Sequence, residues 1–434
     1  MSWQLKKRVS ALSRWLNGSS ANRPKYARPP VVVPAPDAFV PSEVDPAPVV
    51  PQANPLPNRL ILGRVFDSAH PVRSREELLG RRRELDELLA ATLDFGQHAI
   101  VHGARGSGKT SLVRIFGDHA DQGGAVVIYM ACEPGVSFSE LILPYLRAIP
   151  TAALRPGARE AFARGLDALP ATFGPRAVVE LVAEQVSSPV LFILDEFDRI
   201  TDTVVKADIA AAMKLLSDAL ATVLFVLVGI ARDVSDVVDA HPSLRRHLRT
   251  VALGRIEPTS VDALITNGAA AAGLVFDDRA RAVIARASCG SPFHVRIFAH
   301  HSALAAVRDG SSVVREADAR TGLKTALEHW ASMNHADAAT FVRLVETGQN
   351  LHLLERTARR AAVNDRLEQD GSAETAHTNI LADAVRAEPG MDTALVFRDS
   401  VAPQFLIAFI MLAEVSAPAS VPTARQELPD AVDS

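Results

Sequence analysis

The chain has 434 residues, of which 48% are hydrophobic and 22% are charged, and its formal net charge is -4. This composition excludes an intrinsically disordered chain and provides enough length for two or three compact domains. The chain holds two cysteines, Cys132 and Cys289, which lie far apart. The sequence therefore suggests neither a disulfide framework nor a cysteine zinc site, and a cytoplasmic location is expected. No apolar run reaches the roughly 18 residues of a membrane-spanning helix.

The first segment, residues 1–20, has the pattern of a basic amphipathic helix. Residues 1–28 contain seven Lys or Arg and no acid. This charge favours contact with anionic lipid, nucleic acid or a partner protein, and a frayed basic terminus is the alternative. Eleven prolines follow within residues 24–57, which predicts a disordered linker over residues 21–58.

Apolar runs that alternate with helical patterns characterise residues 59–255. Near-continuous apolar strands indicate burial on both faces, and the alternation with helices indicates a parallel sheet covered on both sides. We therefore predict an α/β fold for this segment. The predicted strands span residues 98–103, 125–132, 189–196, 222–229 and 250–253.

A glycine-rich loop follows the first predicted strand and precedes a helix, with the sequence GARGSGKT. Its spacing is that of a P-loop, in which backbone N–H groups and a helix N-terminus surround phosphate oxygens. Lys109 is expected to contact the β and γ phosphates, and the Thr110 hydroxyl to ligate Mg²⁺. An ordinary glycine-rich turn is the alternative. The predicted phosphate-binding residues are Gly103, Ala104, Arg105, Gly106, Ser107, Gly108, Lys109, Thr110 and Ser111.

Two carboxylates end the third predicted strand, in the sequence LFILDEFD. Asp195 is expected to hold the Mg²⁺, and Glu196 to polarise the water that attacks ATP. Burying two adjacent carboxylates without a cation is costly, so a purely structural role is the weaker interpretation. Asp198 follows in the same acidic segment, and the alternative role for its side chain is to cap the next helix.

The P-loop, the LDEFD segment and the later sequence HPSLRRHL together resemble AAA+ ATPases of the initiator and transposition-regulator type, which include the archaeal Orc1/Cdc6-like proteins. The segment LLGRRRELDELL looks like the motif that precedes the P-loop in that group. The resemblance implies a sheet in the order 5-1-4-3-2, a helical lid and Mg²⁺-dependent ATP hydrolysis. It also implies that Leu79, Gly80 and Arg81 border the adenine.

In such ATPases an arginine before the fifth strand often enters the ATP site of a neighbouring subunit. By this resemblance Arg246, with Arg245 next and Arg249 as a further candidate, would act in trans in a homo-oligomer. A solvated basic face is the alternative interpretation.

Two features depart from the family pattern. Gly229 stands where a polar sensor is usual, so a backbone group or Arg232 would have to replace that sensor. The lid sequence CGSPFHVR resembles the lid of STAND-type signalling ATPases, in which the proline lies against the adenosine. Pro292 is expected there, and Arg296 is expected as a γ-phosphate sensor or, equally, as a surface arginine.

Helical patterns fill most of the remaining sequence. We expect a helical lid at residues 256–322, a helical or winged-helix-like C-terminal domain at 323–414 and a disordered tail at 415–434. The apolar run at 401–413 is too short to cross a membrane and predicts a buried helix.

Two functions remain open at this point. One is a nucleotide-driven oligomeric switch in signalling or defence, with a protein partner on the C-terminal domain or the N-terminal helix. The other is an ATPase that assembles on duplex DNA. Residues 323–412 hold eight Lys or Arg and twelve acids, whereas a DNA-reading surface needs clustered positive charge, so the sequence favours the switch.

Overall fold

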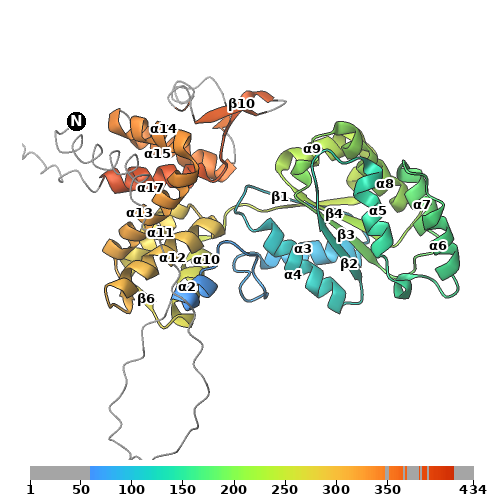
Figure 1. The fold of residues 1–434 in the computed structure, drawn as a ribbon, viewed down its shortest axis with the longest axis horizontal. Coiled ribbons are helices and arrows are strands. Elements are labelled where there is room, and N and C mark those ends of the chain that lie inside the picture. Colours follow the sequence, from blue (N-terminus) through green and yellow to red (C-terminus); the bar gives the residue numbers. More distant parts are fainter. Residues whose placement is uncertain are drawn as a thin grey trace, which may run out of the picture.

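The structure is a computed structural model that describes residues 59–347, 351–364, 367–368, 381, 384–388 and 391–414. The predicted basic helix, the Pro-rich linker and the tail from residue 415 lie outside the described residues. An α/β lobe and a mainly helical lobe make up the described part (Figure 1).

The α/β lobe contains a five-stranded parallel sheet in the order β2-β3-β4-β1-β5. This is the order implied by the family resemblance, read from the other edge. Each predicted strand is present, with the ends shifted by one or two residues. The strands are β1 (His98–His102), β2 (Val126–Ala131), β3 (Val190–Asp195), β4 (Val223–Gly229) and β5 (Leu248–Ala252).

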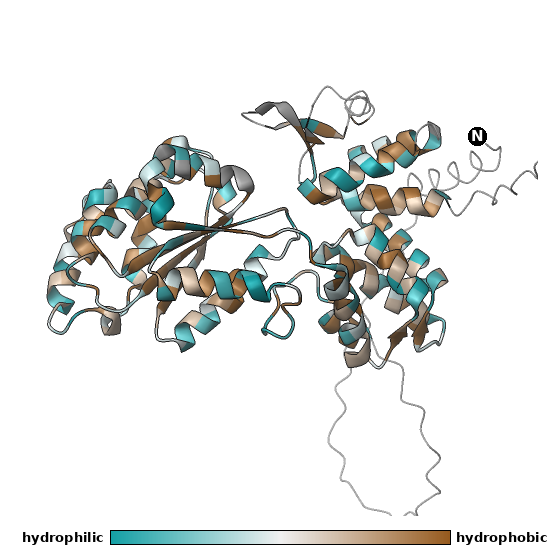
Figure 2. Cartoon of the chain, turned by 180° about the vertical axis from the view of Figure 1, so that it is seen from behind, coloured by the Kyte–Doolittle hydropathy of each residue, from teal (hydrophilic) through white to brown (hydrophobic). Residues whose placement is uncertain are grey.

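Helices cover both faces of this sheet, as the apolar strands require. Helices α3 (Arg82–Leu89) and α4 (Lys109–Gln122) pack on one face, and α5 (Phe138–Ala148), α7 (Pro175–Val182) and α8 (Thr203–Asp218) pack on the other. Every residue of β3 and β4 is buried, because successive side chains enter opposite layers. Figure 2 shows the resulting hydrophobic strands between helices with hydrophilic outer sides. The smaller elements are η1 (Ala90–Asp94), η2 (Thr151–Ala153), α6 (Arg159–Asp167), η3 (Phe197–Arg199), α9 (Ala231–Ala240) and η4 (Pro242–Arg246).

The helical lobe is built around one continuous hydrophobic core. Its helices are α2 (Arg59–Val65), α10 (Pro258–Ala271), α11 (Asp278–Ser288), α12 (Pro292–Arg308), α13 (Glu316–Met333), α14 (His335–Thr347), α15 (Leu351–Asn364) and α17 (Ala402–Glu414). A two-stranded pair joins β6 (Val275–Phe276) to β7 (Val313–Val314). A three-stranded sheet contains β8 (Leu367–Glu368), β9 (Val385–Glu388) and β10 (Met391–Phe397), with β10 in the middle.

Two expected domain limits differ from the structure. The division at residues 322 and 323 falls inside α13, whose Ala319, Leu323 and Trp330 all belong to the same core. The segment from residue 59 does not begin in the α/β lobe, because Leu62 of α2 packs into the core of the helical lobe. The lid and the C-terminal helices therefore form one packed unit.

Helix α17 is the buried helix predicted for the apolar run near residue 401. Its 13 residues fill the centre of the helical lobe, where Phe405 stacks on Trp330 at a centroid distance of 5.1 Å. A search of the described residues finds no helix with the length and apolar character needed to cross a membrane.

Candidate functional site

The glycine-rich loop connects the end of β1 at His102 to the start of α4 at Lys109. Gly103, Gly106 and Gly108 all have positive φ, which side chains rarely tolerate. A Cβ added to Gly103 would lie 2.4 Å from the Leu253 carbonyl oxygen, so the loop also needs glycine for close approach to the neighbouring chain. The sequence thus dictates the curled loop that precedes a helix N-terminus.

Lys109 lies along the inside of this loop. Its Nζ donates hydrogen bonds to the backbone carbonyls of Gly103 at 2.6 Å and Ala104 at 3.1 Å. The ammonium group is therefore held at the concave side of the loop, where a phosphate would accept the same donors.

Thr110 and Asp195 meet at the carboxyl end of the sheet. The Thr110 hydroxyl donates to Asp195 Oδ2 at 3.0 Å, and the Tyr129 hydroxyl donates to the same oxygen. The Glu196 backbone N–H donates to Asp195 Oδ1 at 2.8 Å. A hydroxyl and a buried carboxylate side by side are the oxygen ligands that Mg²⁺ prefers, so the residues present fit a magnesium ion.

Glu196 directly follows this carboxylate. Its φ of 54° is a left-handed conformation that is uncommon for a residue with a side chain and that is found at functional sites. The side chain is exposed, and its Oε2 lies 3.1 Å from Arg199 Nη1. Asp195 is buried whereas Glu196 is exposed, and both line the same cavity.

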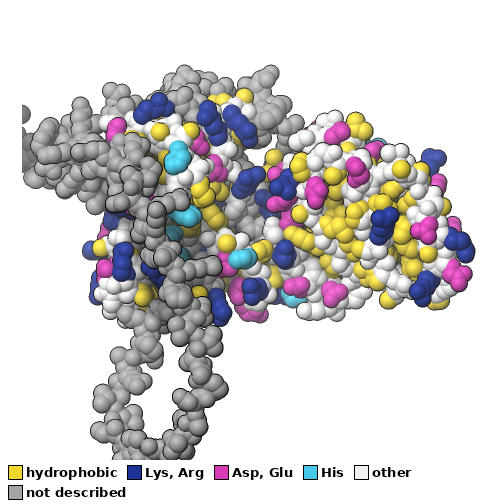
Figure 3. Space-filling view, in the orientation of Figure 1, with side chains coloured by type: hydrophobic (Ala, Val, Ile, Leu, Met, Phe, Trp, Pro, Cys, Tyr) yellow, Lys and Arg dark blue, Asp and Glu magenta, His cyan; other side chains and the backbone are white. Residues whose placement is uncertain are grey.

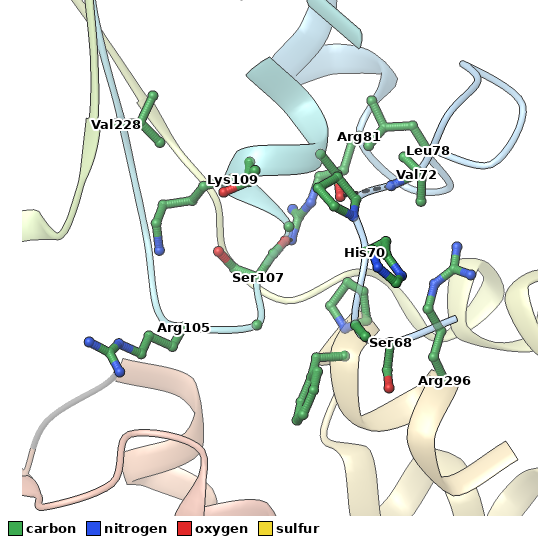
Figure 4. A pocket seen from close by; sticks show the side chains of 18 of the residues that line it. Ser68, His70, Val72, Leu78, Arg81, Arg105, Ser107, Lys109, Val228 and Arg296 are labelled. Atoms are coloured by element: carbon green, nitrogen blue, oxygen red, sulfur yellow. Dashed lines mark hydrogen bonds between the residues drawn. The ribbon is translucent and has the colours of Figure 1, made fainter. Parts of the chain in front are cut away.

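These groups line a cavity of about 640 Å³ that lies between the two lobes. Figure 4 shows residues of the P-loop, the segment before it and α12 around this space. The predicted site residues that line it are Leu79, Arg81, Arg105, Gly106, Ser107, Gly108, Lys109, Thr110, Ser111, Asp195, Glu196, Pro292 and Arg296. Gly103, Ala104 and Gly80 are not among its lining residues.

Arg81 lines the cavity and also holds the P-loop in place. It is 3% exposed, and its guanidinium donates to Glu84 Oε1 at 3.1 Å, to the Ser107 carbonyl at 3.0 Å and to the Gly254 carbonyl. Through these bonds the Arg81 side chain links the P-loop to the segment after β5. Gly80 has a φ of 74°, and an added Cβ would lie 2.8 Å from Ser260 Oγ, so its glycine is required for packing.

The lid contributes the start of α12. Ser291 Oγ lies 3.4 Å from the Gly106 carbonyl oxygen, and the Phe293 N–H donates to the same carbonyl at 3.4 Å. Pro292 and Phe293 line the cavity beside the P-loop. Arg296 Nη1 donates to the Val65 carbonyl at 3.4 Å, and in Figure 4 Arg296 lies near His70 and Ser68, on the side away from Lys109.

The three candidate arginines for a neighbouring subunit lie in η4 and β5, outside the cavity. Arg245 and Arg246 are exposed in η4, and neither lines the cavity of its own chain. Arg249 in β5 pairs with Glu87 of α3 at 2.6 Å, which ties it to its own chain. Of the three candidates, Arg245 and Arg246 therefore retain a side chain available to a neighbour.

The end of β4 carries no polar side chain at the position where related ATPases have a sensor residue. Gly229 ends the strand, and Val228 and Ile230 on either side of it line the cavity with apolar side chains. The Arg232 side chain lies outside the described residues.

Two parts of the site, residues 67–72 and Tyr129, were not predicted from the sequence. Residues 67–72 line the cavity, where His70 Nδ1 lies 2.8 Å from Asp67 Oδ2 and the Val72 N–H donates to Ser111 Oγ at 3.3 Å. This segment precedes every recognisable motif and carries no pattern of its own. Tyr129 could be placed beside Asp195 only once β2 and β3 are known to be neighbours.

A search of the described residues finds no cluster of three His, Cys, Asp or Glu arranged to hold a metal. His294 is fully buried, and burial lowers its pKa to about 3, so it is a neutral packing residue at physiological pH.

The parallel sheet, the curled glycine loop and the Thr110–Asp195 pair define a P-loop nucleoside triphosphatase. Within this class, residues 77–226 match the family described as AAA ATPase domain. The match confirms the expected AAA+ resemblance over the P-loop and the acidic pair, and ATP hydrolysis is the activity of such a domain. No curated protein matches the chain.

Several solved structures are similar to the chain. The Walker-type ATPase PABY2304 of Pyrococcus abyssi is 15% identical with a TM-score of 0.45, over 79% of this chain and 99% of that one. The ORC2 protein of Aeropyrum pernix is 16% identical with a TM-score of 0.42, over 82% and 98% of the respective chains. The RuvB Holliday junction branch migration motor of Thermotoga maritima is 16% identical with a TM-score of 0.42, over 75% and 95%.

Proposed function

We propose that the chain hydrolyses ATP with Mg²⁺ and uses the nucleotide state to move its helical lobe, as a switch in signalling or defence. The P-loop N–H groups and Lys109 would hold the phosphates, and Thr110 and Asp195 would hold the metal. The bound metal would neutralise charge on the phosphates. Glu196 would orient and polarise the attacking water.

The observation that carries the switch is the single core of the helical lobe. The lid motif at the start of α12 contacts the P-loop, and the same helix packs against α13, which packs against α17. A packed core transmits displacement because it has few voids in which movement could be absorbed. Any shift of the lid on the nucleotide would therefore carry the C-terminal helices with it.

A line of hydrogen bonds follows the same route. The Val401 carbonyl can only accept, so His294 Nε2, at 3.1 Å, carries the proton of the neutral ring. His294 Nδ1 then accepts from the Ser291 hydroxyl at 2.9 Å. That hydroxyl also lies 3.4 Å from the Gly106 carbonyl, and it has one proton for the two acceptors. The Gly106 carbonyl of the P-loop and the His294 ring, which bonds to the residue before α17, thus share the single hydroxyl proton of Ser291.

The switch is tested by measuring the distance between the lobes in each nucleotide state. Fluorophores placed on α6 and α14 of the full chain should report different transfer efficiencies with ADP and with a non-hydrolysable ATP analogue. Lys109→Ala protein should show no such difference, because it cannot bind the phosphates. Equal efficiencies in all states of the unmodified protein would contradict the proposal.

Oligomerisation is part of the proposal. The exposed position of Arg246, outside the cavity of its own chain, supports a role in a neighbouring subunit. We also propose a cytoplasmic location, which the two free, buried cysteines support. Mass measurement with the ATP analogue tests the oligomer, and fractionation of the native cells tests the location.

Assembly on duplex DNA is the second candidate. The three-stranded sheet β8-β10-β9 follows α14 and α15, an order typical of a winged helix, and Lys and Arg side chains gather on that part of the helical lobe in Figure 3. Helix α15 carries Arg356, Arg359 and Arg360; Arg356 and Arg360 are exposed, but Arg359 pairs with Glu355 of its own helix at 2.7 Å. DNA-stimulated ATP turnover at low salt would favour this candidate, and its absence would favour the switch.

A further inference from the structure

The turn that follows β3 places two oppositely charged side chains at the nucleotide cavity. The Arg199 N–H donates to the Glu196 carbonyl at 2.9 Å, and the turn continues as the 3-10 helix η3. Phe197 and Ile200 are buried and fix this turn to the core of the α/β lobe. Residues three apart lie on the same side of a 3-10 helix, so Glu196 and Arg199 face the cavity together.

Arg199 has a distinct place among the cations of the cavity. Within the described part of the chain, the Lys and Arg side chains that line the cavity are Arg81, Arg105, Lys109, Arg199 and Arg296. Arg81 is bound to three protein groups, and Arg296 lies on the side away from Lys109 (Figure 4). Arg105 and Lys109 belong to the P-loop. Arg199 is thus the cavity cation that comes from the end of β3, next to the carboxylates of Asp195 and Glu196.

The surroundings of Arg199 are acidic. Asp195, Glu196 and Asp198 of the same segment line the cavity. In the proposed function the terminal phosphate of ATP lies against this end of the sheet. Like charges at short distance repel, so a phosphate beside Glu196 requires a cation there. A guanidinium binds carboxylate and phosphate oxygens with the same donors, so Arg199 can serve either partner.

The ion pair observed in the structure is one that ATP can open. Arg199 Nη1 lies 3.1 Å from Glu196 Oε2, and the two side chains are 51% and 53% exposed. Exposed ion pairs contribute little to stability, because water solvates both groups and the long side chains lose conformational freedom. While Arg199 holds the Glu196 carboxylate, that carboxylate is a poorer acceptor for a proton from water. ATP hydrolysis therefore requires Arg199 to move.

We propose that Arg199 is a catalytic residue that leaves Glu196 for the terminal phosphate of ATP. The exchange neutralises charge on the phosphate oxygens and frees the Glu196 carboxylate. Glu196 then takes a proton from the attacking water as the water oxygen bonds to phosphorus. The bond from phosphorus to the bridging oxygen breaks, and its electron pair leaves on ADP. This inference rests on the proposed ATPase function and adds to it a cation that the chain supplies to its own site.

Nucleotide binding without turnover gives the first test. Calorimetric titration of the full chain compares a non-hydrolysable ATP analogue with ADP, each with Mg²⁺. Arg199→Gln should lower the affinity for the analogue about tenfold and leave the affinity for ADP unchanged, because only the analogue carries the terminal phosphate. An equal loss for both nucleotides, or no loss for the analogue, would overturn the proposal.

Steady-state turnover gives the second test. Arg199→Gln should lower kcat about 10²–10³-fold, which is more than the change in binding. Arg199→Lys should recover part of this loss, because an ammonium group still neutralises the phosphate. If Arg199 only restrained Glu196, Arg199→Gln would raise kcat instead, and that result would also overturn the proposal.

Arg164→Gln is the matched control. Arg164 is an exposed arginine on α6 that pairs with Glu160 of the same helix at 3.8 Å, and it is not among the lining residues of the cavity. This variant should change neither nucleotide affinity nor kcat, and circular dichroism verifies that each variant is folded.

The proposed function and this inference fail in different ways. If the ATPase function is wrong, the unmodified protein shows no ATP turnover, and the binding comparison still decides the role of Arg199. If this inference is wrong, the unmodified protein turns over ATP and Arg199→Gln does so at the same rate or faster.

Discussion

The buried pair of Arg81 and Glu84 leads to a quantitative prediction about the P-loop. Arg81 bonds to the Glu84 carboxylate, to the Ser107 carbonyl and to the Gly254 carbonyl, and it is 3% exposed. Arg81→Met keeps much of the volume but removes all three bonds. It also leaves Glu84, which is 9% exposed, without its cation.

Breaking a buried ion pair by removing one partner costs about 3–5 kcal/mol. We therefore expect Arg81→Met to lower the free energy of unfolding of the α/β lobe by about 4 kcal/mol, measured by urea unfolding followed by circular dichroism. ATP affinity should fall too, because the Ser107 carbonyl loses the anchor that fixes the loop. Adding Glu84→Gln should recover part of the loss, since a neutral amide is cheaper to bury than a lone carboxylate.

The neighbouring Arg82→Met is the control, because Arg82 is exposed and should change stability by less than about 0.5 kcal/mol. A loss below about 1 kcal/mol for Arg81→Met, or no recovery on adding Glu84→Gln, would refute the assignment of Arg81 as the anchor of the loop.

Three further predictions concern catalysis, pH and assembly. Tyr129→Phe removes one hydrogen bond to Asp195, so kcat at limiting Mg²⁺ should fall about tenfold and recover at high Mg²⁺; an unchanged Mg²⁺ dependence in steady-state assays would contradict this. The pKa of His294 is about 3 in the folded protein and about 6.5 in an unfolded chain, so its contribution to stability is complete above pH 6.5 and is lost as pH falls towards 3. Urea unfolding at pH 7 and pH 5 should therefore show a smaller loss for His294→Gln than for the unmodified protein, and equal losses would argue against it. Mixing Arg246→Ala subunits with Glu196→Gln subunits should restore part of the ATPase activity that each lacks alone, and no restoration in a mixing assay would count against a shared site.

The sequence was sufficient to predict the strands of the sheet and the curled loop between β1 and α4. Continuous apolar runs can only be buried strands, and the glycine spacing before Lys109 leaves few other conformations, so strand positions and the P-loop followed from local pattern. The strand order came from the family resemblance. Asp195 could be placed at the carboxyl end of the sheet because it ends a buried strand, although β4 separates this strand from β1, which leads into the loop.

Features that depend on tertiary contacts were not predictable in this way. The boundary at residue 323 was wrong because α13 continues through it, and helical periodicity does not report which core a helix joins. The hydrogen bonds of Arg81 to the Ser107 and Gly254 carbonyls could not be predicted, because these partners lie 26 and 173 residues away in the chain. The segment 67–72 has no pattern of its own, and it reaches the site only through the packing of the two lobes.

The central claim is that Asp195 and Glu196 convert bound ATP into a hydrolysis cycle. The most direct test compares ATP binding and turnover in Glu196→Gln with those of the unmodified protein, with Glu180→Gln on α7 as the control. We expect Glu196→Gln to keep its ATP affinity and to lose turnover by about 10²–10⁴-fold, and the control to change in neither. Normal hydrolysis in Glu196→Gln, with ATP bound, would contradict it.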